Sequence, residues 1–142
     1  MPFGSHIQPA VRQAELQGVT ILAVEDHADS LELLTETLEV LGATVFPAAT
    51  SREAFALLLR HRPQLIISDI GLPDEDGCGL MRRIRALSPE QGGTTPAIAV
   101  SAFTSAEDRK RALAAGFEAF VPKPMALDKL TSSIRALSLP KP

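Results

Sequence analysis

The sequence predicts a doubly wound α/β domain whose five-stranded parallel sheet has the strand order 2-1-3-4-5. Short apolar runs alternate strictly with amphipathic stretches, as expected for consecutive βα units. The runs that end at Asp69 and Ser101 are also continuously apolar, which is typical of strands that helices bury on both faces. Right-handed crossovers then place helices on both sides of the sheet.

The first βα unit begins with an expected strand over 19–24. The helix that follows can be capped by Asp29 or Ser30, and Gly42 follows its end. Its apolar stripe repeats at helical spacing at Leu31, Leu34, Leu38 and Leu41. An amphipathic helix is therefore expected between the first two strands.

The second and third strands are expected over 44–47 and 64–69. Ser51 can cap the helix between them, which ends before Pro63. The next helix carries an apolar stripe and is closed by Ser88-Pro89. The apolar positions of these two helices are Ala54, Leu57, Leu58, Leu80, Ile84 and Leu87.

The last two strands are expected over 96–101 and 118–121. Between them lies an unusually polar helix, 105–115, which starts at Ser105 and stops at Gly116. A final amphipathic helix is expected over 126–137. Its stripe is formed by Leu127, Leu130, Ile134 and Leu137.

Length and composition indicate one globular domain of ordinary character. The chain has 142 residues, of which 45% are hydrophobic and 22% charged. The alternating pattern covers 19–138, so we expect 1–18 to be a flexible tail or linker and 139–142 a short C-terminal tail. The net charge of -3 argues against nucleic-acid binding. No apolar run approaches about 18 residues, so no membrane insertion is expected. The single cysteine, Cys78, fits a reducing compartment, so we expect a cytoplasmic protein.

Polar side chains end four of the apolar runs: Glu25-Asp26, Asp69, Ser101 and Lys123. In a sheet of order 2-1-3-4-5 the first and third strands are neighbours, so their carboxyl ends bring three carboxylates together. Such a cluster repels itself unless a hard cation binds, and Mg²⁺ suits carboxylate and phosphate oxygens. Any one of these acids alone is explained as well by a helix cap, but the whole set favours a phosphoryl-transfer site.

Asp69 is the expected reacting group. A carboxylate at the tip of a buried strand can attack phosphorus and form an aspartyl-phosphate. Lys123 would balance the charge of the phosphoryl group, and Ser101 would donate a hydrogen bond to one of its oxygens.

These separated motifs resemble the receiver domains of two-component response regulators (CheY-like), which have a flavodoxin-like (βα)5 fold. The resemblance covers about 19–137. It rests on Glu25-Asp26, Ser68-Asp69-Ile70-Gly71-Leu72-Pro73 with Asp76-Gly77, Val100-Ser101-Ala102, and Lys123-Pro124. The loop 89–96 and the stretch 109–117 are most similar to receivers of hybrid histidine kinases.

The resemblance implies a role for each site residue. Asp69 is then the phosphoacceptor, Lys123 contacts the phosphoryl group, and Ser101 and Phe120 form the switch. The Mg²⁺ ligands it implies are Glu25, Asp26, Asp69 and the backbone carbonyl of Gly71. It also implies a cis Lys123-Pro124 peptide. The pair Glu25-Asp26, Ser101 and Phe120 depart from the commoner Asp-Asp, Thr and Tyr of this family.

The resemblance further implies a signalling protein that catalyses only its own phosphoryl transfer and autodephosphorylation. The donor is the phosphohistidine of a histidine kinase or a histidine phosphotransfer domain. Phosphorylation would repack the surface 105–137, which would then bind an unknown downstream protein. The chain is interpreted either as a free-standing regulator or as the receiver of a larger protein.

Two other functions fit part of the pattern. A phosphohydrolase of the haloacid dehalogenase type has its nucleophile on the first strand and a second acid two residues later, but here Asp26 is followed by His27-Ala28. A receiver that binds partners without phosphorylation is the other alternative. His6, His27 and His61 match no zinc motif, and His27 is interpreted as a residue of the loop or helix start that could touch the edge of the site.

Overall fold

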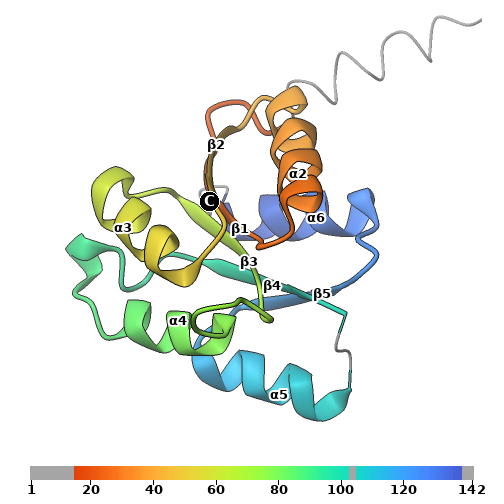
Figure 1. The fold of residues 1–142 in the computed structure, drawn as a ribbon. Helices are drawn as coiled ribbons and strands as arrows, with labels where there is room; N and C mark the ends of the chain where they lie inside the picture. Colours follow the sequence, from red (N-terminus) through yellow and green to blue (C-terminus); the bar gives the residue numbers. More distant parts are fainter. Residues whose placement is uncertain (1–14, 103–104, 139–142) are drawn as a thin grey trace, which may run out of the picture.

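The computed structural model describes residues 15–102 and 105–138, and within them it has the predicted topology. Five parallel strands form one sheet in the order β2-β1-β3-β4-β5 (Figure 1). The strands are β1 (Thr20–Val24), β2 (Thr44–Ala48), β3 (Leu65–Asp69), β4 (Ala97–Ser101) and β5 (Ala119–Pro122). The helices are α2 (Ala28–Val40), α3 (Ser51–His61), α4 (Gly77–Arg85), the short 3₁₀ helix η1 (Pro89–Gln91), α5 (Ala106–Ala115) and α6 (Leu127–Ser138). Each strand boundary falls within one residue of its prediction.

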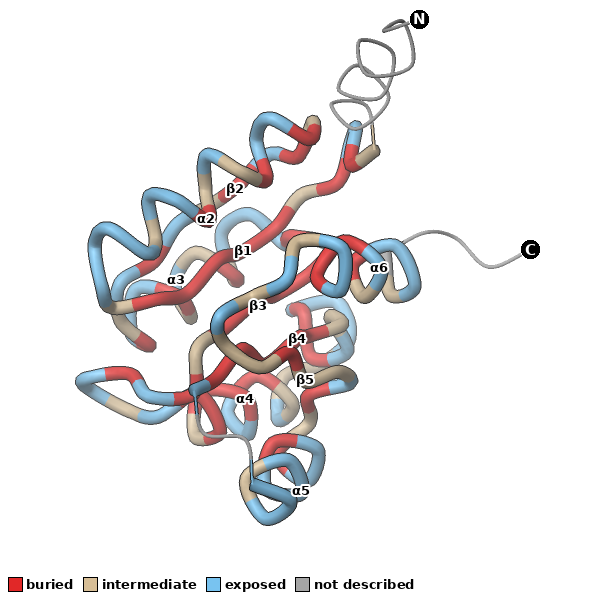
Figure 2. The backbone as a smooth tube through the Cα atoms, turned by 90° about the vertical axis from the view of Figure 1, so that its right-hand side faces the viewer, coloured by how far each residue is buried: buried red, intermediate tan, exposed pale blue. Residues whose placement is uncertain are grey.

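Helices cover both faces of the sheet and define two separate hydrophobic cores. On one face α2 and α6 pack on the sheet, and on the other face α3, α4 and α5 do so (Figure 1). Alternate residues of β1 supply the two cores, because side chains of a strand point to opposite faces in turn. Leu22 and Val24 lie in the core under α3, α4 and α5, whereas Ile21 and Ala23 lie in the core under α2 and α6. Figure 2 shows the central strands buried along their lengths.

The register of the sheet brings the carboxyl ends of the strands to one edge. Val24 of β1 is paired with Ser68, and Asp69 of β3 is paired with Val100. Ser101 of β4 is paired with Pro122 of β5. The residues that follow these strands, and the last residue of β3, therefore lie along a common edge, where an open α/β sheet holds its ligands.

The helix caps differ in part from those predicted. The N-cap of α2 is His27, whose side chain makes no capping hydrogen bond, so Asp29 and Ser30 were wrong as caps. Thr50 rather than Ser51 caps α3, and its side chain accepts a hydrogen bond from the amide of Glu53. A cap needs an extended backbone just before the first turn, whereas Asp29, Ser30 and Ser51 already lie inside their helices.

The cap of α5 is confirmed. The hydroxyl of Ser105 accepts from the amide of Asp108 at 3.1 Å, and the carboxylate of Asp108 accepts from Ser105 in return. Gly116 ends the helix with a φ of +117°, a conformation that glycine adopts without steric cost. This helix is therefore delimited by strong local signals in spite of its thin apolar stripe.

The expected N-terminal tail is shorter than predicted. Leu16 is only 1% exposed, and its amide donates to the carbonyl of Leu41 at the end of α2 at 2.8 Å. Glu15 lies 3.5 Å from Arg135 of α6. Residues 15–18 therefore pack on the domain, because a lone leucine in a polar stretch finds apolar partners only in the folded chain. The tails predicted over 1–14 and 139–142 lie outside the described residues.

Candidate functional site

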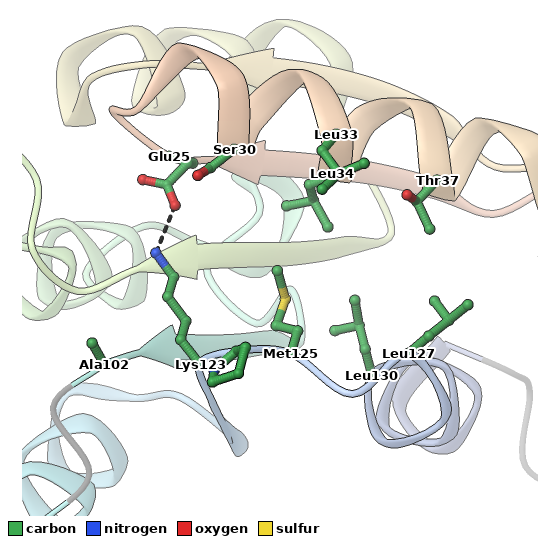
Figure 3. Close-up of a pocket in the computed structure, with 11 residues that line it drawn as sticks. Glu25, Ser30, Leu33, Leu34, Thr37, Ala102, Lys123, Met125, Leu127 and Leu130 are labelled. Carbon is green, nitrogen blue, oxygen red and sulfur yellow. Dashed lines mark hydrogen bonds and ion pairs between the residues drawn. The ribbon is translucent and has the colours of Figure 1, made fainter.

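An ammonium group joins two carboxylates at the carboxyl edge of the sheet. Nζ of Lys123, just after β5, lies 2.6 Å from Oε1 of Glu25, just after β1. The same nitrogen lies 2.9 Å from Oδ2 of Asp69, the last residue of β3. Figure 3 shows Lys123 reaching from below to Glu25, which precedes α2. Three of the residues singled out in the sequence thus converge.

The three side chains are partly withdrawn from water, so their charges interact strongly. The exposed fraction is 5% for the Glu25 side chain, 12% for Asp69 and 26% for Lys123. Burial acts to lower the pKa of Lys123, but the hydrogen bonds to Glu25 and Asp69 outweigh it and hold that pKa above its usual range. Lys123 is therefore a permanent cation at neutral pH, and Asp69 retains enough exposure to meet a substrate.

Asp26 and His27 lie beside Glu25, on the side of the site that faces α2. Oδ1 of Asp26 is buried and accepts no hydrogen bond within the described part of the chain. Nδ1 of His27 lies 3.4 Å from this oxygen and 3.4 Å from Oε2 of Glu25. One potential ligand atom from each of these three residues lies within 4.8 Å of the others. Asp69 is linked to this acidic cluster through Lys123.

The charges and donors of the cluster fit a hard divalent cation. Glu25, Asp26 and Asp69 carry three negative charges and Lys123 one positive charge, which leaves two uncompensated negative charges (-3 + 1 = -2). A buried carboxylate oxygen without a hydrogen bond is costly unless it gains a partner. A divalent cation would supply both the partner and the missing charge, and Mg²⁺ prefers such oxygen ligands.

The loop after Asp69 is held tightly against that residue. The amide of Gly71 donates to Oδ1 of Asp69 at 3.2 Å, and the amide of Gly77 donates to the carbonyl of Ile70 at 2.6 Å. A Cβ added at Gly77 would overlap the carbonyl oxygen of Asp69 and lie 3.0 Å from Cα of Ile70. Only glycine fits this close approach, so Gly77 helps to set the position of the Asp69 backbone.

A second set of contacts ties this loop to the start of α3. The carboxylate of Asp74 accepts from the amides of Ser51 and Arg52 at 2.9 and 3.0 Å. The hydrogen bond from Ser51 is the main cause that lowers the pKa of Asp74. The hydroxyl of Ser51 in turn donates to the carbonyl of Glu75 at 2.7 Å. Sequence reasoning missed this role because the partners lie 22 to 24 positions apart.

The two expected switch residues lie on the neighbouring strands β4 and β5. Ser101 is fully buried at the end of β4, and its carbonyl accepts from the amide of Lys123 at 2.9 Å. Phe120 of β5 is half-buried against the core under α3, α4 and α5. The guanidinium of Arg109 lies 5.4 Å from the centre of its ring. Ser101 thus adjoins Lys123 through the backbone, whereas Phe120 faces α5.

The other expectations for the site concern single residues. The Lys123-Pro124 peptide is cis, as the resemblance implied. His61 stacks on Phe46 with ring centres 4.2 Å apart, at the end of α3. The position of the Gly71 carbonyl relative to a metal remains a prediction.

An apolar pocket of about 690 Å³ lies beside the acidic cluster, between α2 and α6. Glu25 and Lys123 form its polar end, and its apolar walls come from both helices and from Met125, which precedes α6 (Figure 3). The residues of these walls are Leu33, Leu34, Met125, Leu127 and Leu130. The site therefore opens next to a hydrophobic surface rather than into an isolated cleft.

A sequence profile decides the family. The profile of the response regulator receiver domain matches residues 21–135. The chain belongs to this family. The receiver fold, with strand order 2-1-3-4-5, and the family match agree with the interpretation drawn from the separated motifs. They leave no reason to assign the chain to the haloacid dehalogenase type.

Several receivers and regulators are similar to this chain. An uncharacterized 14.6 kDa protein of Leptolyngbya boryana is 42% identical over 110 residues, which cover 78% of this chain and 82% of the other. The sensor histidine kinase RcsC of Escherichia coli is 33% identical over 114 residues, 80% of this chain but 12% of that protein. The receiver domain of a signal transduction histidine kinase from Syntrophus aciditrophicus superposes with a TM-score of 0.76 at 33% identity and covers 84% of this chain and 89% of that one.

Several of these relatives are much longer than the part of them that matches this chain. The chain spans about half the length of the transcriptional regulators that it matches. Proteins of this family interact with histidine kinases or phosphotransfer proteins. Among the residues that the structure describes, no helix is long and apolar enough to span a membrane.

Proposed function

We propose that this receiver accepts a phosphoryl group on Asp69 from the phosphohistidine of a histidine kinase or of a histidine phosphotransfer domain. The observation that carries the proposal is the position of Lys123, whose Nζ bridges Oε1 of Glu25 and Oδ2 of Asp69 at 2.6 and 2.9 Å. A cation between the metal-binding edge and the reacting carboxylate is placed to neutralise an incoming phosphoryl group.

The chemical step is an in-line displacement at phosphorus. An oxygen of Asp69 forms the new P–O bond while the P–N bond of the donor breaks, and the electron pair of that bond returns to the imidazole nitrogen, which takes up a proton. Lys123 then pairs with the phosphoryl oxygens, and Ser101 donates its hydroxyl hydrogen to one of them. Attack of water on the aspartyl-phosphate later releases inorganic phosphate and restores the carboxylate.

The expected cofactor is Mg²⁺, held by the carboxylates of Glu25, Asp26 and Asp69 and by the backbone carbonyl of Gly71. When bound, the ion supplies two positive charges to the phosphoryl oxygens and lowers the repulsion between them and the site. The buried, unbonded Oδ1 of Asp26 and the net charge of -2 around it support this assignment.

The output is proposed to be a change of the surface 105–137. A phosphoryl group adds about two negative charges next to Ser101. Movement of Ser101 toward it would leave space that Phe120 can fill, and Phe120 contacts Arg109 of α5. Because the buried side chains of α5, Ala112 and Ala115, are small, this helix has weak anchors in the core and can repack for an unknown downstream protein.

The expected compartment of the reaction follows from the histidine kinase as phosphoryl donor. A histidine kinase draws its phosphoryl group from a nucleoside triphosphate, so we propose a cytoplasmic reaction. Identity of 33% to RcsC and to the Syntrophus kinase receiver fits an origin in a hybrid histidine kinase, and identity of 42% to the 14.6 kDa Leptolyngbya protein fits a free-standing regulator equally well, so both origins stay open.

Mass spectrometry of the intact protein tests the proposal. After incubation with Mg²⁺ and acetyl phosphate, the wild type should gain one labile phosphoryl adduct, and Asp69→Asn should gain none. Asp29→Asn, which changes an exposed carboxylate of α2, is the matched control and should be labelled like the wild type. An adduct of equal yield in Asp69→Asn contradicts the assignment. No adduct in any variant favours a receiver that acts without phosphorylation, and sustained release of phosphate from phosphomonoesters favours a phosphohydrolase.

A further inference from the structure

His27 presents a nitrogen to the acidic cluster. Its Nδ1 lies 3.4 Å from Oε2 of Glu25 and 3.4 Å from Oδ1 of Asp26. The backbone holds the residue there, because His27 is the N-cap of α2 and its amide donates to the same oxygen of Glu25 at 3.3 Å. The imidazole is thus positioned by the start of the helix rather than by chance contacts of a free loop.

The spacing of these atoms matches donors around one metal ion. Donors about 2.1 Å from a shared ion lie about 3 Å apart when adjacent and about 4.2 Å apart when opposite. The two separations of 3.4 Å fall near the first distance, and all three donors lie within 4.8 Å of one another. Small rotations of the side chains would therefore place one nitrogen and two oxygens on a common ion.

Glu25 and Asp26 each offer an oxygen to a shared ion, and the charge of the site suits a divalent ion. Oε1 of Glu25 is occupied by Lys123, whereas Oε2 faces the histidine. Oδ1 of Asp26 is buried without a hydrogen bond. A neutral imidazole adds a donor without changing the site's charge of -2, so the charge match to a divalent ion is kept. The His27 side chain is 74% exposed, so ions reach it from solvent.

We infer that His27 is an additional ligand of the cation site and raises its affinity for divalent first-row transition ions relative to its affinity for Mg²⁺. Imidazole nitrogen suits Mn²⁺ and the later transition ions, whereas Mg²⁺ prefers sites made of oxygen alone. The inference rests on the proposed function, because it adds a donor to the same cation site. Nδ1 binds through its lone pair, and the ring proton then resides on Nε2.

Pulsed electron paramagnetic resonance of the full chain with Mn²⁺ alone tests the inference directly. Directly bound nitrogen produces a hyperfine coupling to Mn²⁺, and this coupling should be present in the wild type and change with ¹⁵N-histidine labelling. It should vanish in His27→Ala. His61→Ala is the matched control, because His61 is also exposed but stacks on Phe46 at the end of α3, and this variant should retain the coupling.

Titrations of the same proteins with Mn²⁺ and with Mg²⁺ provide a second measurement. His27→Ala should lower Mn²⁺ affinity by about tenfold. Mg²⁺ affinity should change less than about twofold. Mn²⁺ binding without nitrogen coupling, or equal losses for both ions, overturns the inference and leaves the proposed function intact. Failure of the wild type to bind either ion contradicts the cation site of the proposed function as well, and an adduct persisting in Asp69→Asn contradicts that function alone.

Discussion

Nζ of Lys123 lies 2.9 Å from Oδ2 of Asp69 across a separation of 54 residues. The pair joins the ends of β3 and β5, which are separated in the sheet by β4. Glu25 binds the same nitrogen, so one ammonium serves two carboxylates. The first two predictions change the net charge of this site. One substitution removes its positive charge, and the other removes a negative charge.

Lys123→Met should destabilise the protein when divalent ions are absent. The substitution keeps the length of the side chain but leaves Glu25, whose side chain is 5% exposed, without its counter-charge. An uncompensated buried acceptor costs about 2 kcal/mol. Urea denaturation in a chelating buffer measures the effect, and an unfolding free energy equal to that of the wild type would contradict this role of Lys123.

Asp26→Asn should stabilise the protein in the same chelating buffer, by about 1 kcal/mol. The substitution removes one negative charge at a buried oxygen that accepts no hydrogen bond from residues 15–102 or 105–138. Mg²⁺ at 100 times its dissociation constant should stabilise the wild type by about 2.7 kcal/mol but the variant far less. Glu36→Gln on the exposed face of α2 is the control and should change neither value. Equal stabilisation of Asp26→Asn by Mg²⁺ would exclude Asp26 as a ligand.

Gly77→Ala should displace the backbone of Asp69. A Cβ at Gly77 meets the carbonyl oxygen of Asp69, which is rigid backbone. At Gly79, two residues along α4, a Cβ meets only the flexible side chain of Glu75 at 2.9 Å. Gly77→Ala should lower the unfolding free energy by about 2 kcal/mol and slow phosphorylation. Gly79→Ala should be close to neutral, because alanine also favours a helix. Similar losses in both variants would contradict a specific contact.

Arg85→Met should weaken the contacts that hold the end of α5 against α4. The guanidinium donates two hydrogen bonds to the carbonyl of Gly116 and one to that of Gly93, and it pairs with Glu118 at 3.1 Å. Loss of these bonds should lower the unfolding free energy by about 2 kcal/mol and increase amide exchange around Gly116. Arg82→Met, at an exposed position of the same helix, is the matched control. Unchanged exchange in Arg85→Met would show that the guanidinium does not hold α5.

The Asp74 carboxylate should stabilise the protein above its ordinary pKa of 3.8 and lose this effect in acid. Its folded pKa is lowered, chiefly by the hydrogen bond from Ser51, so the stabilisation is present above 3.8 and disappears as the pH falls through the lower folded value. Asp74→Asn should therefore be less stable than the wild type at neutral pH, and the difference should vanish in strong acid. Denaturation curves between pH 7 and pH 2 measure this difference in stability. A difference that grows as the pH falls would contradict a lowered pKa of Asp74 in the folded protein.

The alternation of apolar and amphipathic segments was enough to predict the sheet. Buried parallel strands require continuous apolar runs, and a pattern of that kind is local to each segment. Turn signals such as Ser105 and Gly116 were also local, so α5 was delimited correctly. The strand order came from the doubly wound class, for which 2-1-3-4-5 is one of the two common orders, and the structure confirms it.

The predictions that failed depended on contacts between distant segments. Leu16 looked like part of a tail, since its burial depends on the carbonyl of Leu41 and on the core under α2 and α6. Ser51 was assigned as a cap, but its hydroxyl donates to Glu75 in another loop. The interpretation of His27 as a residue of the helix start at the edge of the site was confirmed, although nothing local indicated where its Nδ1 would lie.

By itself the sequence determined the order of elements and the kinds of side chain that end each strand, because both are written in short stretches of neighbouring residues. The predicted sheet already placed these side chains at one edge, but only the tertiary structure decided which atoms meet and at what distance. Lys123 reaches Glu25 across 98 residues, and that distance of 2.6 Å is set by the parallel register of β1, β3, β4 and β5 and by the two cores that hold the sheet. Such a contact depends on packing of the whole domain, which no local pattern encodes.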